Sequence, residues 1–309
     1  MMTPQATTRG QVPFSDESTG APCVTRFAPS PTGRLHLGHA YSALTAHDYA
    51  RERDGAFLLR IEDIDPGRSR RDHVEAIFED LTWLGLEWDG EVMFQSGRLD
   101  AYAAALDRLK EQGLIYPCFC TRAQITAEIA ASAAAPHGAE GPVYPGTCRS
   151  LPPSRHEAKR SERPHAWRLD VRAALAAVAG PLIWREGEDE IPAQPQLFGD
   201  VVLARKDAPA SYHLAVTIDD AAQGVTDVVR GRDLSASTHI HCLLQALLSL
   251  PRPNYHHHRL IAGPDGQRLA KRHGAPTIGA LRASGTDPTA LVDSLRKGRL
   301  PAGYLPAEA

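Results

Sequence analysis

The order of strand and helix patterns is the feature that most constrains how this chain folds. Residues 23–28 and 57–61 are short, mostly apolar segments that predict buried strands. A helical pattern lies between them at 37–53, and two more follow at 74–84 and 99–112. A glycine lies just beyond each of the three. Because parallel strands need a crossover connection, this alternation predicts a parallel sheet covered by helices.

The middle of the chain interrupts this order. Residues 118–195 hold a cysteine cluster, an Ala/Gly-rich stretch and Pro-, Arg- and Glu-rich sequence, which predicts an inserted subdomain rather than a continuation of the sheet. Apolar segments at 200–204 and 214–218 predict strands of a second half, and a helix is expected at about 235–250. The expected fold class is α/β, with a split Rossmann-type parallel sheet and a short C-terminal helical segment. The expected parts are a disordered polar tail, the first half of the sheet, the insertion, the second half and the C-terminal segment, at 1–22, 23–117, 118–195, 196–250 and 251–309.

Composition excludes several classes of protein. With 42% hydrophobic and 23% charged residues, the chain does not have the composition of a disordered protein. Its longest apolar stretch, 242–250, is far shorter than the roughly 20 residues of a membrane span, so no membrane partner is expected. A net charge of −3 gives no overall positive field toward nucleic acid. Five cysteines, three of them clustered, favour a reducing cytoplasm and a metal over disulfides.

The string RFAPSPTGRLHLGH at 26–39 is the sharpest chemical signal. A strand ends, a Pro/Gly turn follows, and a helix begins with His36 and His39 on the same side of its first turn. A helix N-terminus attracts phosphate, and two imidazoles can donate to phosphate oxygens. Gly38 has no side chain, which would let a flat base approach the backbone. Taken alone, two histidines at this spacing more often mark a proline-rich turn that carries two surface side chains.

The whole string closely resembles the first signature of the class I aminoacyl-tRNA synthetases in its glutamyl/glutaminyl form. Further strings of that branch occur in the right order: RIEDID at 60–65, WLGLEWD at 83–89, SYHLA with an Asp pair at 211–220, and GVTDVVRGRDL at 224–234. The second signature of the family is KMSKS, where this chain has RLAKR at 268–272. Lys271 takes the place of the lysine that contacts ATP phosphate, but Arg268 replaces the first lysine and Ala270 the first serine.

The resemblance implies an amino-acid site beside an ATP site. In it, Glu62 is placed to pair with the α-ammonium group, and two arginines around one small ligand argue for a dicarboxylate rather than glutamine. Phosphate charge would be stabilised by His36, His39 and Lys271, with Mg²⁺ entering as Mg·ATP. The expected ATP-binding residues are His36, Gly38, His39 and Lys271. The expected glutamate-binding residues are Arg26, Phe27, Ala28, Pro29, Ser30, Glu62, Tyr212 and Arg230.

The cysteine cluster reads Cys-Phe-Cys at 118–120, followed after 23 residues by Tyr-Pro-Gly-Thr-Cys at 144–148. Three thiolates suit tetrahedral zinc and leave a fourth ligand to find; the alternative is three free thiols. The resemblance to the glutamyl-Q branch of the family implies the set Cys118, Cys120, Tyr144 and Cys148, holding one structural Zn²⁺ per chain.

The resemblance also implies the reaction. The α-carboxylate of L-glutamate attacks the α-phosphate of ATP, pyrophosphate leaves, and the glutamyl group passes to an acceptor. Only 37 residues follow Arg272, too few for an anticodon-binding domain, which favours the truncated glutamyl-Q tRNA(Asp) synthetases. These place glutamate on the queuosine base of tRNA(Asp) and activate glutamate without tRNA. A minimal glutamyl-tRNA synthetase charging a tRNA 3′ end, and a non-catalytic glutamate or adenylate sensor, stay as alternatives. A cytoplasmic monomer is expected.

Two further groups invite a metal interpretation. His256, His257 and His258 are consecutive, but neighbouring strand residues point to opposite faces, so the three cannot converge on one ion. We expect them to be structural or on the surface. Asp219 and Asp220 suggest Mg²⁺, but the favoured alternative is that they hold the elements carrying Tyr212 and Arg230 in place.

Overall fold

The computed structural model describes residues 22–131, 137–138, 141–263, 276–300 and 304–306. The expected N-terminal tail and the RLAKR segment with Lys271 lie outside these residues. The α-helices are α1 Leu37–Arg51, α2 Arg71–Trp83, α3 Leu99–Glu111, α4 Arg122–Ala131, α5 Pro153–Glu162, α6 Val171–Ala177, α7 Tyr212–Ala222, α8 Thr238–Leu248, α9 Ile278–Ala283 and α10 Pro288–Arg296. The strands are β1 Val24–Phe27, β2 Ala56–Ile61, β3 Met93–Phe94, β4 Ile115–Cys118, β5 His137–Gly138, β6 Gly141–Pro142, β7 Ala166–Leu169, β8 Ile183–Glu186, β9 Asp189–Pro192, β10 Val202–Ala204, β11 Asp227–Gly231, β12 Asn254–His258, β13 Ile261–Ala262 and β14 Leu305–Pro306.

A parallel sheet in two parts forms the centre of the molecule. In the first part the order is β1-β2-β3, and in the second β11, β12 and β8 are parallel, with β9 antiparallel at the edge. The two parts meet at the starts of β1 and β11, where the Thr226 amide donates to the Val24 carbonyl at 3.0 Å. Helix α1 packs across this junction, against β1, β2 and β11. The expected split parallel sheet is therefore confirmed.

The glycines after two helices end them as the sequence predicts. Gly85 follows α2 and Gly113 follows α3, with φ of +72° and +70°, where only glycine is unstrained. The amides of Leu86 and Leu114 then donate back to carbonyls of the last helical turn. Each helix is thereby closed and the chain redirected within two residues.

One strand prediction is wrong, and a second predicted strand lies in a different sheet from the one expected. Residues 214–218 lie in the helix α7, because a short apolar run cannot distinguish a buried strand from a helix buried on most sides. The strand at 200–204 exists as β10, but it pairs antiparallel with β7, which pairs antiparallel with β4, in a separate sheet. Conversely, β8 lies within 118–195 yet joins the parallel sheet beside β12, so the insertion is not wholly apart from it.

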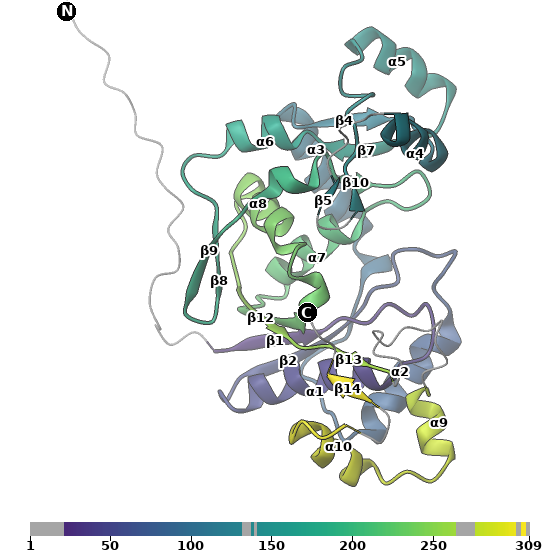
Figure 1. Ribbon diagram of the computed structural model, residues 1–309, viewed down its shortest axis with the longest axis vertical. Helices are drawn as coiled ribbons and strands as arrows, with labels where there is room; N and C mark the ends of the chain where they lie inside the picture. Colours follow the sequence, from purple (N-terminus) through teal and green to yellow (C-terminus); the bar gives the residue numbers. More distant parts are fainter. Residues whose placement is uncertain (1–21, 132–136, 139–140, 264–275, 301–303, 307–309) are drawn as a thin grey trace, which may run out of the picture.

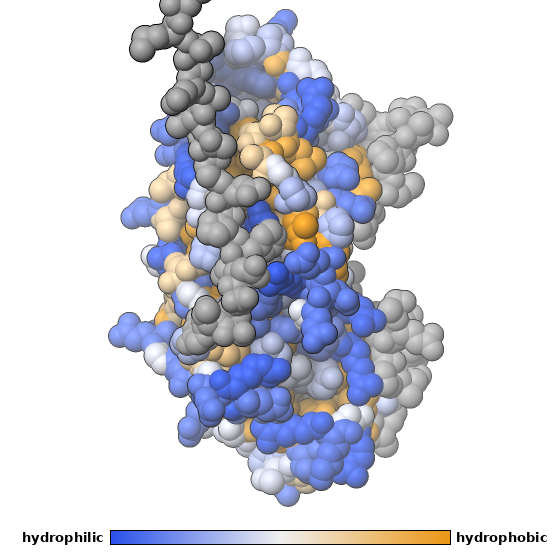
Figure 2. Space-filling model, turned by 90° about the vertical axis from the view of Figure 1, so that its left-hand side faces the viewer, coloured by the Kyte–Doolittle hydropathy of each residue, from blue (hydrophilic) through white to orange (hydrophobic). Residues whose placement is uncertain are grey.

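The sheets and helices enclose two main hydrophobic cores. One lies around β1, β2, α1, α2 and α10 in the lower part of Figure 1, and the other around α3, α7 and α8 above it. Figure 2 shows one side of the molecule, where hydrophilic side chains cover most of the lower part and apolar ones gather in the upper part. Within the described residues, no helix has the length and apolarity needed to cross a membrane.

Candidate active site

A cavity of about 390 Å³ opens where the two parts of the parallel sheet meet. Its walls come from the carboxyl ends of β1 and β11 and from the start of α1. Strand order reverses at this junction, and in open α/β sheets such a switch point is where ligands bind. The position of the cavity thus follows from the topology.

The cavity gathers the described residues that the sequence assigned to amino acid and ATP. These residues come from segments up to about 200 positions apart. Lys271, the remaining residue of the predicted site, lies outside the described residues. Their roles remain predictions. The residues lining the cavity include Arg26, Phe27, Ala28, Pro29, Ser30, His36, Gly38, His39, Glu62, Tyr212 and Arg230.

The first turn of α1 fixes both histidines. His36 is the N-cap: its Nδ1 accepts from the Gly38 amide at 3.1 Å, and Nδ1 of His39 accepts from the His36 amide at 3.1 Å. The two rings lie 3.8 Å apart between centroids. Since Nδ1 is an acceptor in both, each neutral ring carries its proton on Nε2. The arrangement therefore sets the tautomer that a phosphate oxygen requires.

Gly38 lines the cavity and lies against the His36 ring. A Cβ there would lie 3.1–3.2 Å from the ring atoms of His36. Its lack of a side chain makes room for the His36 ring, and its role in letting a base approach the backbone stays a prediction.

Arg26 is buried in an ion-pair network. It is 4% exposed, and its Nε donates to Asp220 Oδ1 at 2.9 Å, while Arg60 Nη2 donates to the same oxygen at 2.7 Å. Burial would raise the pKa of Asp220, but the two guanidinium groups hold it below its usual range. Arg26 thus has an anionic partner inside the protein.

The Asp219 carboxylate is also fully engaged in hydrogen bonds. Its carboxylate accepts from Gln95 Nε2 at 3.0 Å, Arg98 Nε at 3.2 Å and the Tyr102 hydroxyl at 2.6 Å. The side chains that contact Asp219 and Asp220 are hydrogen-bond donors that fix α7 against β1, β2 and α3. These contacts support the predicted structural role for α7, which carries Tyr212, but none of these side-chain contacts reaches β11, which carries Arg230.

Glu62 follows β2 and lines the cavity. Burial raises the pKa of its carboxyl to about 7, although Arg60 and Arg26 act in the opposite direction. A cationic group entering the cavity would favour the ionised form. Glu62 is thus suited to receive an ammonium group.

Arg230, on β11, is also 4% exposed, yet its partners are uncharged side chains. Among the described residues no carboxylate lies within ion-pairing distance of it. Its hydrogen bonds run from Nη1 to the Tyr212 hydroxyl at 3.1 Å, from Nη2 to Thr238 Oγ1 at 2.7 Å, from Nε to His257 Nε2 at 3.2 Å and from Nη1 to His241 Nδ1 at 3.4 Å. The guanidinium charge is buried without an anion in contact.

The sequence did not single out Thr238 and His241, and it assigned His257 no place at the site. The histidines alternate between the two faces of β12 as predicted: His256 contacts Tyr49, whereas His257 contacts Arg230 on the other face. Strand periodicity alone could have placed His257 with Tyr255 on one face; its partner on β11 needed the sheet order.

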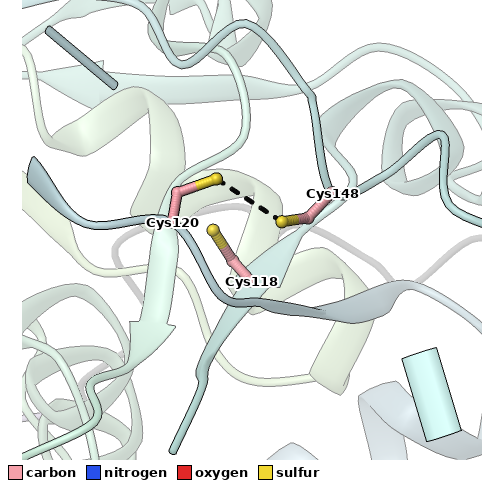
Figure 3. A group of neighbouring side chains, drawn as sticks. All are labelled: Cys118, Cys120 and Cys148. Carbon is pink, nitrogen blue, oxygen red and sulfur yellow. Dashed lines mark hydrogen bonds between the residues drawn. The ribbon is translucent and has the colours of Figure 1, made fainter. Parts of the chain in front are cut away.

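The three clustered cysteines point toward one another in Figure 3, with the Sγ atoms of Cys120 and Cys148 3.5 Å apart. Their ligand atoms all lie within 4.8 Å of one another, so they could hold a metal ion. Tetrahedral zinc, with bonds of about 2.3 Å to sulfur, needs sulfurs about 3.8 Å apart. The Tyr144 hydroxyl lies 3.5 Å from the sulfurs of both Cys118 and Cys120. The three thiols could hold a metal ion, and the Tyr144 hydroxyl lies beside them, so its place as the fourth ligand stays a prediction.

Comparison with known proteins identifies the family of this chain. Residues 22–303 match the family model described as tRNA synthetases class I (E and Q), catalytic domain. The chain therefore belongs to this family and is a ligase of the tRNA synthetase type.

Among curated proteins, it is 49% identical to the glutamyl-Q tRNA(Asp) synthetase of Rhodobacter capsulatus, over 86% of this chain and 96% of that one. The protein of the same name from Symbiobacterium thermophilum is 45% identical over 87% and 84%. The glutamate–tRNA ligase of Aquifex aeolicus is 40% identical over 88% of this chain and 56% of its own length. A crystal structure of an Elizabethkingia meningosepticum glutamate tRNA ligase, in complex with its amino acid, superposes with a TM-score of 0.73 at 27% identity. The match covers 89% of this chain and 60% of that structure.

Proposed function

We propose that this protein activates L-glutamate with ATP and transfers it to the queuosine base of tRNA(Asp). One observation is central: a buried guanidinium, Arg230, faces a cavity shared with Glu62 and with the paired histidines at the start of α1. The cavity thus combines a cationic site, an anionic site and a phosphate-type site within reach of one small amino acid and a nucleotide.

Activation requires positioning and charge stabilisation more than covalent help from the protein. The α-carboxylate of glutamate is ionised at neutral pH and needs no base. It attacks the α-phosphorus in line, and pyrophosphate leaves with the electrons of the broken P–O bond. The Nε2–H groups of His36 and His39, the N-terminus of α1 and Lys271 are placed by this proposal around the phosphates. Mg²⁺, bound with ATP, would neutralise phosphate charge.

The choice of amino acid follows from charge. Glu62 receives the α-ammonium group, and Arg230 supplies an unneutralised positive charge for a substrate carboxylate. Glutamine offers only one carboxylate, so binding it leaves part of this buried charge unmatched. At about 1.5–3 kcal/mol for each charged hydrogen bond, rejection by roughly tenfold to a hundredfold or more is expected.

The acceptor is proposed from the relatives. Proteins named glutamyl-Q tRNA(Asp) synthetase are 42–49% identical to this chain, compared with 40% for the Aquifex glutamate–tRNA ligase. This ordering supports queuosine over the tRNA 3′ end. Action as a cytoplasmic monomer belongs to the same proposal.

The test uses radiolabelled glutamate and tRNA(Asp) with and without queuosine, together with ATP–pyrophosphate exchange in the absence of tRNA. We expect glutamate-dependent exchange without tRNA, and label only on the queuosine-containing tRNA. Equal label on both tRNAs would replace this proposal with a glutamyl-tRNA synthetase. Absence of exchange and of transfer would indicate a binding protein instead.

We also propose that Cys118, Cys120, Tyr144 and Cys148 hold one structural zinc. Although burial opposes it, the Phe119 amide and neighbouring hydrogen bonds lower the pKa of Cys148, which favours a thiolate ligand. Metal analysis should find about one zinc per chain. Cys148→Ser should lose it and unfold at lower temperature, whereas Cys23→Ser, a thiol outside the cluster, should retain it. Full zinc in the Cys148 variant would refute the assignment.

A further inference from the structure

The hydrogen bonds of Arg230 continue through His257 to Glu186, which does not line the cavity. Because a guanidinium only donates, His257 Nε2 is the acceptor of the bond from Arg230 Nε, and the ring proton must be on Nδ1. That Nδ1 lies 3.0 Å from Glu186 Oε1 and therefore donates to it. The two hydrogen bonds thus run in one direction: Arg230 donates to His257, and His257 donates to Glu186.

Glu186 is held where it can act. It is the last residue of β8 and lies opposite Tyr255 of β12 in the parallel register. Its Oε1 also accepts from the His257 backbone amide at 3.1 Å, so one oxygen binds both the main chain and the ring of the same residue. This double contact fixes the orientation of the imidazole.

We propose that Glu186 and His257 are positioning residues, which hold the Arg230 guanidinium in the orientation that receives a carboxylate of the amino-acid substrate. The inference rests on the proposed function and deepens it by naming what sets specificity at the same site.

His257 lies between the Arg230 guanidinium and the Glu186 carboxylate and keeps them out of direct contact. A carboxylate in direct contact with Arg230 would pair with its charge, as Asp220 pairs with Arg26, and would compete with the substrate for Arg230. An imidazole transmits the orientation while leaving the charge available. Burial, followed by the nearby Arg230 charge, lowers the pKa of His257 to about 3, so the ring is neutral at physiological pH.

A second neutral histidine braces the other side of the guanidinium. His241 Nδ1 accepts from Arg230 Nη1, so its Nε2 donates to His213 Nδ1 at 3.3 Å. Burial and Arg230 keep the pKa of His241 well below its usual range. Thus Arg230 determines the tautomers on both sides, and its plane is set by groups from β12 and α8.

The test compares variants of His257 in the full-length protein by glutamate-dependent pyrophosphate exchange. His257→Leu removes the acceptor and should raise KM for glutamate roughly tenfold, with KM for ATP unchanged and with weaker rejection of glutamine. His257→Gln keeps an acceptor oxygen near the Nε2 position and should restore most of the loss. Glu186→Leu should act in the same direction, and combining it with His257→Leu should add little.

The matched control is His256→Leu, one residue away on the opposite face of β12. It should lower thermal stability through its lost contacts to Tyr49 and Asp227 and leave KM for glutamate unchanged. An unchanged KM in His257→Leu, with exchange intact in the unaltered protein, would overturn the positioning role alone. Equal losses in the Leu and Gln variants would also overturn it. No exchange in the unaltered protein would overturn the proposed function as well.

Discussion

Two buried arginines at the ends of neighbouring strands differ in how their charge is balanced. Arg26 on β1 and Arg230 on β11 are each 4% exposed and line the same cavity. Arg26 is paired with Asp220, whereas Arg230 contacts hydroxyls and neutral imidazoles. Burying a charge without an anion costs stability. The fold neutralises Arg26 internally, whereas among the described residues the charge of Arg230 has no anion in contact until a ligand supplies one.

The two arginines therefore affect different properties: Arg26 mainly the stability of the fold, and Arg230 mainly the choice of amino-acid substrate. Arg26 belongs to a network that also holds α7 to β2 through Arg60. Arg230 contributes little to that network, and its partners fix its direction rather than its charge. We therefore expect substitutions at the two sites to differ in which property they change most.

The largest effect is expected on removing the unneutralised charge. Arg230→Gln should lower kcat/KM for glutamate in pyrophosphate exchange roughly a hundredfold or more, because charged hydrogen bonds to the substrate are lost. Its melting temperature should be unchanged or higher, since a buried charge without a contacting anion is gone. A clear drop in melting temperature would break the comparison.

The opposite balance is expected at Arg26. Arg26→Gln leaves the buried Asp220 carboxylate with Arg60 as its remaining cation. The free energy of unfolding should fall by about 3 kcal/mol, the lower end of the cost of breaking a buried ion pair. Glutamate binding should weaken while ATP binding survives. Denaturant unfolding measures the first effect and calorimetric titration the second; equal stability of the Arg26 and Arg230 variants would contradict the account.

The smallest effect concerns pH. With a pKa of about 7 in the free protein, Glu62 is protonated below pH 7, but binding of the substrate ammonium favours the carboxylate. Glutamate affinity should therefore fall below pH 7, by up to about tenfold per unit. KM for glutamate measured between pH 5.5 and 8.5 tests this, and Glu62→Gln should flatten the profile. A flat profile in the unaltered protein would remove Glu62 from the ammonium site.

Much of the site could be predicted because its residues lie in short continuous strings. The turn before α1 places both histidines, and the strand ends place Arg26 and Arg230. The pairing of Arg26 with Asp220 could not be predicted, because 194 positions separate them and only the fold brings them together. The interpretation of 214–218 as a strand failed because burial on most sides hides helical period, and even Asp219 and Asp220 are buried there.

The position of β8 shows the same limit. Its sequence lies among Pro-, Arg- and Glu-rich residues, and nothing local indicates that it returns to the parallel sheet. Its pairing with β12 places Glu186 beside His257. Only this long-range contact shows that His257, predicted to be structural or on the surface, belongs to the surroundings of Arg230.

The most direct test measures kcat/KM for pyrophosphate exchange with L-glutamate and with L-glutamine, using the unaltered protein without tRNA. If the unneutralised charge of Arg230 selects the substrate, glutamate should be preferred at least tenfold, and Arg230→Gln should erase most of that preference. Similar values for both amino acids, or a preference that survives in the variant, would contradict the account.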